Sequence, residues 1–245
     1  MIKNSLKNFK MFYLIGLGLE KKAISLESLE ICKRASKIYI EKYTSKFPYA
    51  KKDLEKLIKR KIILLDREKI EDESFLLEAK KKDIVLLVYG SPLIATTHIS
   101  LILRCKKENI KYKIIHNSSI YDAITETGLQ IYKFGKTTSL PKWEENYKPK
   151  SFLNIIKENK KINSHTLILV DPKLRFKEAI EQLEKSGFKG KIIIGEMLGI
   201  KGNIYYEKIS QLKNKKIRHP FCFIIPAKLH FFEKEALDLL SKNKL

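Results

Sequence analysis

Short apolar runs alternate with amphipathic stretches along most of this chain, and this alternation limits the folds that it can adopt. In the first half, runs of about five apolar residues are separated by stretches with the three-to-four-residue apolar spacing of a helix. Strands are predicted over Phe12–Ile15, Ile38–Glu41, Ile62–Leu65, Ile84–Tyr89 and Tyr112–His116. Helices are predicted within residues 25–36, 50–60, 72–82 and 96–109. This order of elements is typical of an α/β fold with a mainly parallel sheet.

The alternation stops over residues 130–149, which hold two prolines, the only tryptophan and many charged residues. Such a composition predicts a connecting segment or a lid and no core element. The alternation then resumes, with helices predicted over Ser151–Glu158, Arg175–Lys185 and Leu229–Leu240 and strands over Leu167–Val170, Lys191–Ile194 and Phe221–Ile225. We therefore expect an N-terminal extension (residues 1–10) and two α/β domains (residues 11–121 and 122–245), with a ligand cleft between the domains.

The composition excludes several classes of protein. The three cysteines are odd in number and lack metal-binding spacing, which argues against a disulfide framework or a structural metal site and favours the cytoplasm. No apolar run reaches the roughly 18–20 residues of a membrane span. The first ten residues are basic but are followed by no signal-peptide pattern. A cytoplasmic protein without a membrane anchor is expected.

The chain is strongly basic, with 50 Lys and Arg residues against 28 Asp and Glu residues and a formal net charge of +22. Such a charge raises the encounter rate with acidic partners of any kind. The lysines are spread over nearly every predicted helix and turn, without the clustering and interleaved aromatic residues typical of nucleic-acid surfaces. No dedicated nucleic-acid partner is therefore predicted.

Three predicted strands in the first half end in turns that suit a ligand. The first is followed by the sequence GLGLE, which allows a tight turn but lacks the third glycine of a dinucleotide-binding motif. The second is followed by GSPLIATTH, in which Thr96 and Thr97 are predicted to cap the next helix. The third ends at His116 in the sequence HNSSIYD, where Ser119 and Asp122 resemble a capping box. Ligands of α/β proteins bind at the carboxyl ends of strands, so the three turns together predict a ligand site.

The chain carries no common catalytic signature. Neither a serine–histidine–aspartate order, HExxH, a P-loop nor a paired-carboxylate motif occurs, which argues against hydrolases, metalloproteases and P-loop enzymes. His116 and His230 are interpreted as structural residues. Asp171, at the end of a predicted strand and before Pro172, either starts a turn or contacts a ligand.

Several stretches together resemble one enzyme family. The strings MFYLIGLGL, YTSKF, GSPLIATTH, HNSSIYDAITETGLQIYKFGKT and IIPAKLH are similar to those of archaeal diphthine synthases, within the tetrapyrrole-methylase-like class. The resemblance runs from Met11, which corresponds to the usual start of the family, to the last predicted helix. It implies two α/β domains with S-adenosyl-L-methionine in the cleft between them, and a homodimer.

The resemblance also implies an activity and its residues. The activity is methylation, up to three times, of the amino group of a 3-amino-3-carboxypropyl-histidine on translation elongation factor 2, which gives diphthine in diphthamide biosynthesis. The cofactor contacts carried over by position are Leu19, Ser91, Ile94, Ser119, Ile120, Val170, Met197 and Phe221. No catalytic residue and no metal ligand is implied, since a sulfonium methyl group is already activated and the protein has mainly to align the acceptor amine.

Three alternatives remain open, and one of them follows from a departure from the family. The family usually has GDPLVATTH, so Ser91 stands where an aspartate is usual, and a member with weakened activity is one alternative. A second is a methyltransferase acting on a tetrapyrrole or another small molecule, although that class favours a GxGPG-like first turn, which GLGLE lacks. A third is a basic nucleic-acid-binding protein.

Overall fold

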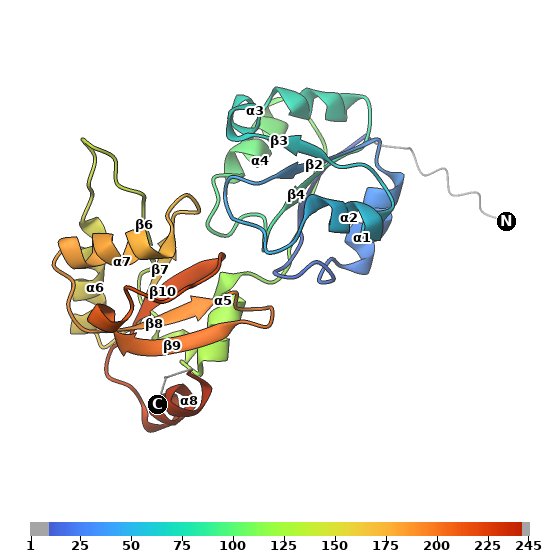
Figure 1. Cartoon of the computed structure of the whole chain (residues 1–245). Coiled ribbons are helices and arrows are strands. Elements are labelled where there is room, and N and C mark those ends of the chain that lie inside the picture. The colour runs from blue at the N-terminus through green and yellow to red at the C-terminus, as the bar shows by residue number, and fades with distance from the viewer. Residues whose placement is uncertain (1–9, 242–245) are drawn as a thin grey trace. The chain divides into compact units, whose positions relative to one another are not determined.

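The computed structural model describes residues 10–241, which form two compact units that meet in the sequence between Ser119 and Ile120 (Figure 1). The predicted extension of residues 1–10 lies outside the described residues except for Lys10, which is exposed. In the described residues, no helix is both long and apolar enough to cross a membrane.

The first unit contains a five-stranded sheet in which every pair of neighbouring strands is parallel. Its strands are β1 (Phe12–Gly16), β2 (Lys37–Glu41), β3 (Ile63–Leu65), β4 (Ile84–Val88) and β5 (Tyr112–Ile115). They lie in the order β3-β2-β4-β1-β5, so that β4, β1 and β5 are neighbours. The five predicted strands and their parallel arrangement are confirmed.

Helices cover both faces of this sheet because its central strands are apolar throughout. Phe12 and Leu14 of β1 pack in one core cluster, with residues of α4 (Ile99–Lys107) and the 3₁₀ helix η1 (Ser74–Lys80). The alternate residues Tyr13 and Ile15 pack in another, with residues of α1 (Leu26–Arg34) and α2 (Lys51–Ile58). This alternation is the two-residue period of a strand buried on both faces.

One helix of the first unit differs from its prediction. The stretch predicted as one helix over residues 72–82 begins at the end of the short helix α3 (Arg67–Asp72) and continues as η1. Glu73 separates the two in a left-handed conformation with φ 59°, so a continuous α-helix cannot form there.

The second unit contains a mixed sheet, so the prediction of a mainly parallel sheet is wrong for this half. Its strands are β6 (Thr138–Leu140), β7 (Thr166–Val170), β8 (Lys191–Glu196), β9 (Asn203–Lys208) and β10 (Phe221–Ile225), in the order β6-β7-β10-β8-β9. Only β6 and β7 are parallel, whereas β10 runs antiparallel to both β7 and β8, and β8 runs antiparallel to β9. Apolar periodicity marks a strand but carries no information on its direction.

Two strands of this unit were not predicted. The stretch of residues 130–149, expected to hold no core element, contains β6, whose Leu140 is fully buried in the core of the unit. The other is β9, whose sequence NIYYEK pairs along all six residues with β8. A three-residue strand and a largely half-buried strand that ends in two charged residues both give weak periodic signals.

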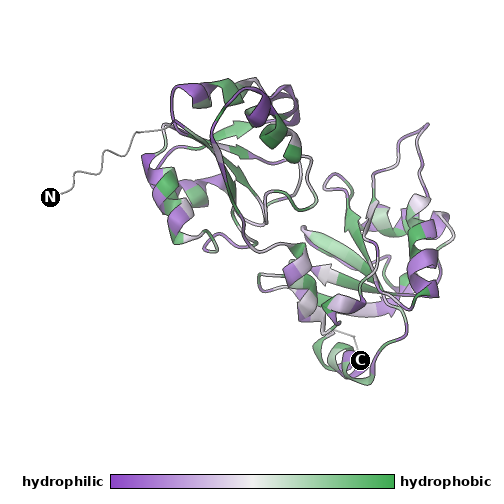
Figure 2. Cartoon of the chain, turned by 180° about the vertical axis from the view of Figure 1, so that it is seen from behind, coloured by the Kyte–Doolittle hydropathy of each residue, from purple (hydrophilic) through white to green (hydrophobic). Residues whose placement is uncertain are grey.

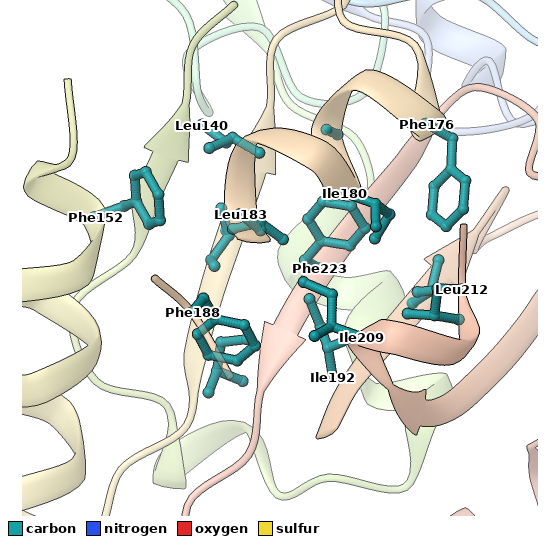
Figure 3. Close-up of a cluster of buried hydrophobic side chains, with 14 of the residues drawn as sticks. Leu140, Phe152, Phe176, Ile180, Leu183, Phe188, Ile192, Ile209, Leu212 and Phe223 are labelled. Carbon is teal, nitrogen blue, oxygen red and sulfur yellow. The ribbon is translucent and has the colours of Figure 1, made fainter. Parts of the chain in front are cut away.

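The core of the second unit lies between its sheet and two helices. Phe152 of α6 (Ser151–Lys161), Ile180 and Leu183 of α7 (Phe176–Lys185) and Phe223 of β10 belong to one cluster of buried side chains (Figure 3). Figure 2 shows the hydrophobic residues of both units concentrated in the strands, while the helices also carry hydrophilic residues. The remaining helical elements are α5 (Ile120–Ala123), α8 (Phe231–Leu240) and the 3₁₀ helices η2 (Ile124–Thr127), η3 (Ile131–Lys133) and η4 (Ile209–Gln211).

A buried carboxylate holds α8 in place. Glu233 is fully buried and accepts hydrogen bonds from Lys133 at 2.5 Å, the Gln130 backbone N–H at 3.0 Å and the His230 backbone N–H at 2.8 Å. The ring of buried His165 lies 3.0 Å from the same carboxylate. Burial alone would raise the pKa of Glu233, but these donors outweigh it and lower the pKa to about 2.

Candidate functional site

The ends of β1 and β4 are joined by a pair of backbone hydrogen bonds. The Gly18 N–H donates to the Gly90 carbonyl at 3.1 Å, and the Gly90 N–H donates to the Gly18 carbonyl at 3.0 Å. Both glycines have positive φ angles, 70° and 73°, which other residues adopt at a cost. Gly16 approaches the same turn so closely that a Cβ would lie 2.6 Å from the Gly90 carbonyl oxygen. The glycines therefore let the two turns lie against each other.

Asn117 ties the third strand end to the first. Its amide nitrogen donates to the carbonyls of Gly16 at 3.2 Å and Ala23 at 2.9 Å, and its amide oxygen accepts from the Ser118 N–H at 2.8 Å. The three turns predicted from the sequence thus meet at the carboxyl edge of the sheet.

Gly90 lies at the centre of this meeting point. A Cβ placed on Gly90 would lie 3.9 Å from the Cα of Ser119 and 4.0 Å from a methyl group of Leu19. Ser91 follows Gly90 in the chain, and Leu19, Ser91 and Ser119 are all buried, at 7%, 5% and 5% exposure. The structure therefore brings three of the sequence-predicted cofactor contacts around one glycine.

The rest of the GSPLIATTH turn projects from the sheet edge. Ile94 is 37% exposed and leaves an apolar side chain at the surface of the turn that holds buried Ser91. Ala95 has a φ of 55°, so the backbone at this point is strained. The Ser91 hydroxyl lies 3.4 Å from Nδ1 of exposed His116.

The predicted threonine cap is wrong. Helix α4 begins at Ile99, its N-cap position is His98, and no side chain caps it. The Thr96 hydroxyl instead donates to the Pro92 carbonyl at 2.8 Å and lies 3.4 Å from the His98 N–H. The threonine therefore closes the turn and does not cap the helix, because a hydroxyl can donate to a nearby carbonyl as readily as it can accept from an N–H group at the start of a helix.

His98 is the most deeply buried polar side chain of this turn, at 1% exposure. Its Nδ1 lies 3.1 Å from the Pro92 carbonyl, which can only accept, so Nδ1 carries the proton and Nε2 presents a lone pair. Nε2 is buried and has no hydrogen-bond partner among the described residues. Burial lowers the pKa of His98, partly opposed by the nearby carboxylate of Glu41, so the ring is neutral near pH 7.

Aromatic residues surround the neighbouring strand ends. Phe47, Tyr49 and Tyr89 form a cluster with ring centroids 5.2–6.3 Å apart. The hydroxyls of Tyr49 and Tyr89 are buried without hydrogen-bond partners among the described residues, and burial raises the pKa of both. The string YTSKF is held at this edge by buried Glu41, which accepts from the backbone N–H groups of Tyr43 at 2.9 Å and Thr44 at 3.1 Å.

The remaining predicted contacts belong to the second unit. Val170 ends β7, Phe221 begins β10, and Met197 follows β8 with its N–H donating to the Pro220 carbonyl at 2.8 Å. Because β10 is antiparallel to both β7 and β8, these three residues lie at one edge of this sheet. Phe221 is buried, whereas Val170 and Met197 are partly exposed, and Met197 has a φ of 51°. Ile120 begins α5, immediately after Ser119.

Two of the residues considered at the sequence level have structural roles. Asp171 accepts from the backbone N–H groups of Lys173 at 2.8 Å and Lys142 at 3.2 Å, and so closes the turn after β7. His230 is the N-cap of α8, as expected for a structural residue. The described residues contain no group of three or more His, Cys, Asp or Glu side chains that could hold a metal ion.

Comparisons with known proteins identify the family. Residues 11–213 match the family described as Tetrapyrrole (Corrin/Porphyrin) Methylases. The chain belongs to this family. The relatives that it resembles include diphthine synthases: that of Methanococcus maripaludis C6 is 40% identical, over 95% of this chain and 100% of the relative. The diphthine synthase of Methanocaldococcus jannaschii is 39% identical over the same shares.

A solved structure and a further sequence relative agree with this assignment. One solved diphthine synthase superposes with a TM-score of 0.85 at 31% identity, covering 94% of this chain and 96% of the other. The diphthine methyl ester synthase of Bos taurus is 44% identical, over 71% of this chain and 62% of the relative. The fold class and the resemblance inferred from the sequence are therefore confirmed.

Sequence reasoning missed two features of this sheet edge. The first is the buried lone pair of His98, which depends on a hydrogen bond to the Pro92 carbonyl. The two residues are six positions apart, and this spacing is only a weak signal for such a bond. The rings of Tyr49 and Tyr89 pack against each other from separate segments of the chain, so no local pattern could indicate this cluster or its buried hydroxyls.

Proposed function

We propose that this protein is an S-adenosyl-L-methionine-dependent methyltransferase that makes diphthine. The proposal rests mainly on 40% identity to a diphthine synthase over that relative's entire length. It is supported by the meeting of three ligand-compatible turns at the carboxyl edge of the first sheet, where ligands of α/β proteins bind.

The first unit supplies four proposed cofactor contacts. Leu19, Ser91 and Ser119 surround Gly90, where the missing side chain leaves room for a ligand to approach the backbone. Ile94 offers an exposed apolar side chain on which a flat ring could pack. Ile120, Val170, Met197 and Phe221 remain the predicted contacts from the second unit.

Ser91 fits a contact made through the backbone. Its side chain is buried and its carbonyl accepts from the Ile94 N–H at 3.2 Å, so the turn closes without the carboxylate that is usual in the family. The turn geometry depends on Gly90 and Pro92 instead. We therefore expect the serine to preserve cofactor binding.

The chemistry needs little from the protein beyond alignment. The cofactor, when bound, supplies an activated sulfonium methyl group. The chain has to hold the acceptor amine in its neutral form, in line and away from water. Apolar and aromatic side chains at the sheet edge, such as Ile94, Phe47 and Tyr89, favour the neutral form of an amine because they desolvate it.

The acceptor is proposed to be the amino group of a 3-amino-3-carboxypropyl-histidine on translation elongation factor 2, methylated up to three times. We place the reaction in the cytoplasm, where translation factors act, and propose a homodimer. The three cysteines are free and buried, which fits a reducing compartment.

A second product is favoured by one comparison. Several eukaryotic relatives, including those of Bos taurus and Homo sapiens, are diphthine methyl ester synthases with 44% and 43% identity over 71% of this chain. The same site could then also methylate the carboxylate of the acceptor.

Mass spectrometry of the modified factor tests both products. Purified protein is incubated with S-adenosyl-L-methionine and elongation factor 2 that carries the unmethylated precursor. Added masses of one to three methyl groups support the proposal, and a fourth, hydroxylamine-labile methyl group identifies the ester. Cofactor binding without any added mass would instead favour a small-molecule acceptor or an inactive member.

A further inference from the structure

A basic hollow lies beside α2 in the first unit, at the sheet edge formed by β3. It measures about 700 Å³. It is lined by Lys51, Lys52, Glu55, Lys56, Lys59, Arg60, Lys61, Ile62 and Ile63, which are six cations, one carboxylate and two isoleucines. The activity proposed above makes no use of this surface.

The single carboxylate of the hollow is already neutralised. Glu55 accepts from the Lys51 ammonium at 2.5 Å and from the Ile62 N–H at 2.9 Å, and Lys51 also donates to the Ile62 carbonyl at 2.9 Å. The hydrogen bond from Lys51 lowers the pKa of Glu55, which is therefore ionised and paired. These contacts close the junction between α2 and β3 and consume one positive charge.

Arg60 also serves the fold. Its guanidinium donates to the carbonyls of Lys33 at 2.5 Å and Ala35 at 2.8 Å, which are orphan groups at the end of α1. Four lysines remain, all exposed and none with an ion pair to a carboxylate in residues 10–241: Lys52, Lys56, Lys59 and Lys61.

The backbone conformation and the spacing of the charges both make this group of lysines unfavourable for the stability of the fold. Lys59 has a left-handed conformation with φ 59° at the end of α2, where glycine is the residue of lowest cost. Lys52 and Lys56 are four residues apart on one helix, a spacing at which like charges repel. Lysines near a helix C-terminus interact favourably with the helix dipole, which explains Lys56 and Lys59 but not Lys52 or Lys61.

The border of the hollow indicates what class of partner fits it. Ile63 and Leu64 of β3 are 43% and 50% exposed, and β3 is the edge strand of its sheet. No aromatic ring lines the hollow within the described residues, so it lacks the stacking platform of single-stranded nucleic-acid sites. Exposed aliphatic side chains beside lysines suit a protein segment that is both acidic and apolar.

We propose that this hollow docks an acidic, partly apolar segment of the protein substrate. The inference rests on the proposed function, since the substrate is then the translation factor itself. Long-range attraction to these four lysines would speed its encounter with the enzyme, and the exposed aliphatic residues would prolong contact.

A charge-reversal pair of variants tests the proposal. The test variant carries Lys52→Glu, Lys56→Glu and Lys61→Glu, and the matched control carries Lys157→Glu, Lys160→Glu and Lys161→Glu on α6, where the three lysines are also exposed. Thermal unfolding and S-adenosyl-L-methionine binding confirm that each is folded. The factor's affinity is measured by fluorescence anisotropy without turnover, and KM and kcat are measured separately.

We expect the test variant to bind the factor about tenfold more weakly, with a KM raised to match, an unchanged kcat and a weaker dependence on salt. The control should stay within about twofold of the wild type. Lys59→Gly should weaken binding while raising thermal stability, since it relieves the left-handed backbone.

Equal affinity of wild type and test variant for the factor would overturn the docking site. The proposal would also be overturned if the test variant lost affinity for a 20-nucleotide RNA probe but kept its affinity for the factor. The hollow would then bind nucleic acid. Binding of the factor that depends on the hollow, without any methyl transfer by the wild type, would overturn the proposed function alone.

Discussion

The imidazole Nδ1 of His98 donates a 3.1 Å hydrogen bond to the carbonyl of Pro92, across the turn that follows β4. This bond places the lone pair of Nε2 in a buried position without a partner among the described residues. This contact therefore fixes the tautomer of the histidine, and together with the hydrogen bond from Thr96 to the same carbonyl it closes the turn that carries Ser91 and Ile94.

The stability of the protein should fall in mild acid because of His98. Burial lowers the pKa of His98 in the folded state below the 6.5 of the unfolded state. As the pH falls below 6.5, the unfolded state therefore takes up a proton before the folded state does, and this uptake favours unfolding. In chemical denaturation at pH 7.5 and 5.5, His98→Gln should show a smaller drop in unfolding free energy than the wild type, by about 1 kcal/mol. Equal drops would contradict the buried neutral imidazole.

Gly90→Ala should weaken cofactor binding more than it weakens the fold. A Cβ at this position meets nothing closer than 3.7 Å, so the stability cost is that of the positive φ, about 1 kcal/mol. The added methyl group would stand among Leu19, Ser91 and Ser119, and we expect roughly tenfold lower affinity for S-adenosyl-L-methionine by calorimetry.

Gly187→Ala is the matched control for this substitution. Gly187 follows α7 in the second unit with a φ of 90°, and a Cβ added there would meet no atom of the described residues within 4 Å. It should lose similar stability and keep the wild-type cofactor affinity. A similar loss of affinity in both variants would show that Gly90 acts only through stability.

Ser91→Ala should leave cofactor affinity within about threefold of the wild type. The expected contact is made through the backbone, and the hydroxyl has one long neighbour, Nδ1 of His116 at 3.4 Å. Calorimetric titration with S-adenosyl-L-methionine measures the effect. A loss of tenfold or more would mean that the side chain binds the cofactor directly.

Glu233→Gln should destabilise the second unit strongly at neutral pH. The folded pKa of about 2 lies below the ordinary value of 4.5, so the carboxylate stabilises the fold above pH 4.5 and loses this effect as the pH falls toward 2. Removing the charge leaves Lys133 unpaired beside a buried group, and we expect a loss of about 3 kcal/mol at pH 7.

Denaturation at two pH values checks this assignment. At pH 3 the difference between Glu233→Gln and the wild type should shrink by more than half. Glu158→Gln, which removes an exposed ion pair with Lys136, should change stability by less than about 1 kcal/mol at either pH. A loss at pH 3 as large as that at pH 7 would show that packing, rather than charge, accounts for the effect of Glu233.

Local patterns predicted part of the turns after β1 and β4. The glycines of GLGLE and GSPLI predicted close turns, and the bonds between Gly18 and Gly90 confirm them. The role of Thr96 was mistaken because capping and turn closure use the same hydroxyl, and only the position of the Pro92 carbonyl decides between them.

The sequence by itself determined that this chain forms α/β units and where most strands and helices lie, because apolar periodicity and turn residues act locally. The family resemblance came from specific strings such as GSPLIATTH. Only the tertiary structure decided the antiparallel direction of β10, the burial of Leu140 in β6 and the burial of the unpaired Nε2 atom of His98 among the described residues. These depend on contacts between segments far apart in the chain, where strand direction, edge position and hydrogen-bond partner are chosen by packing.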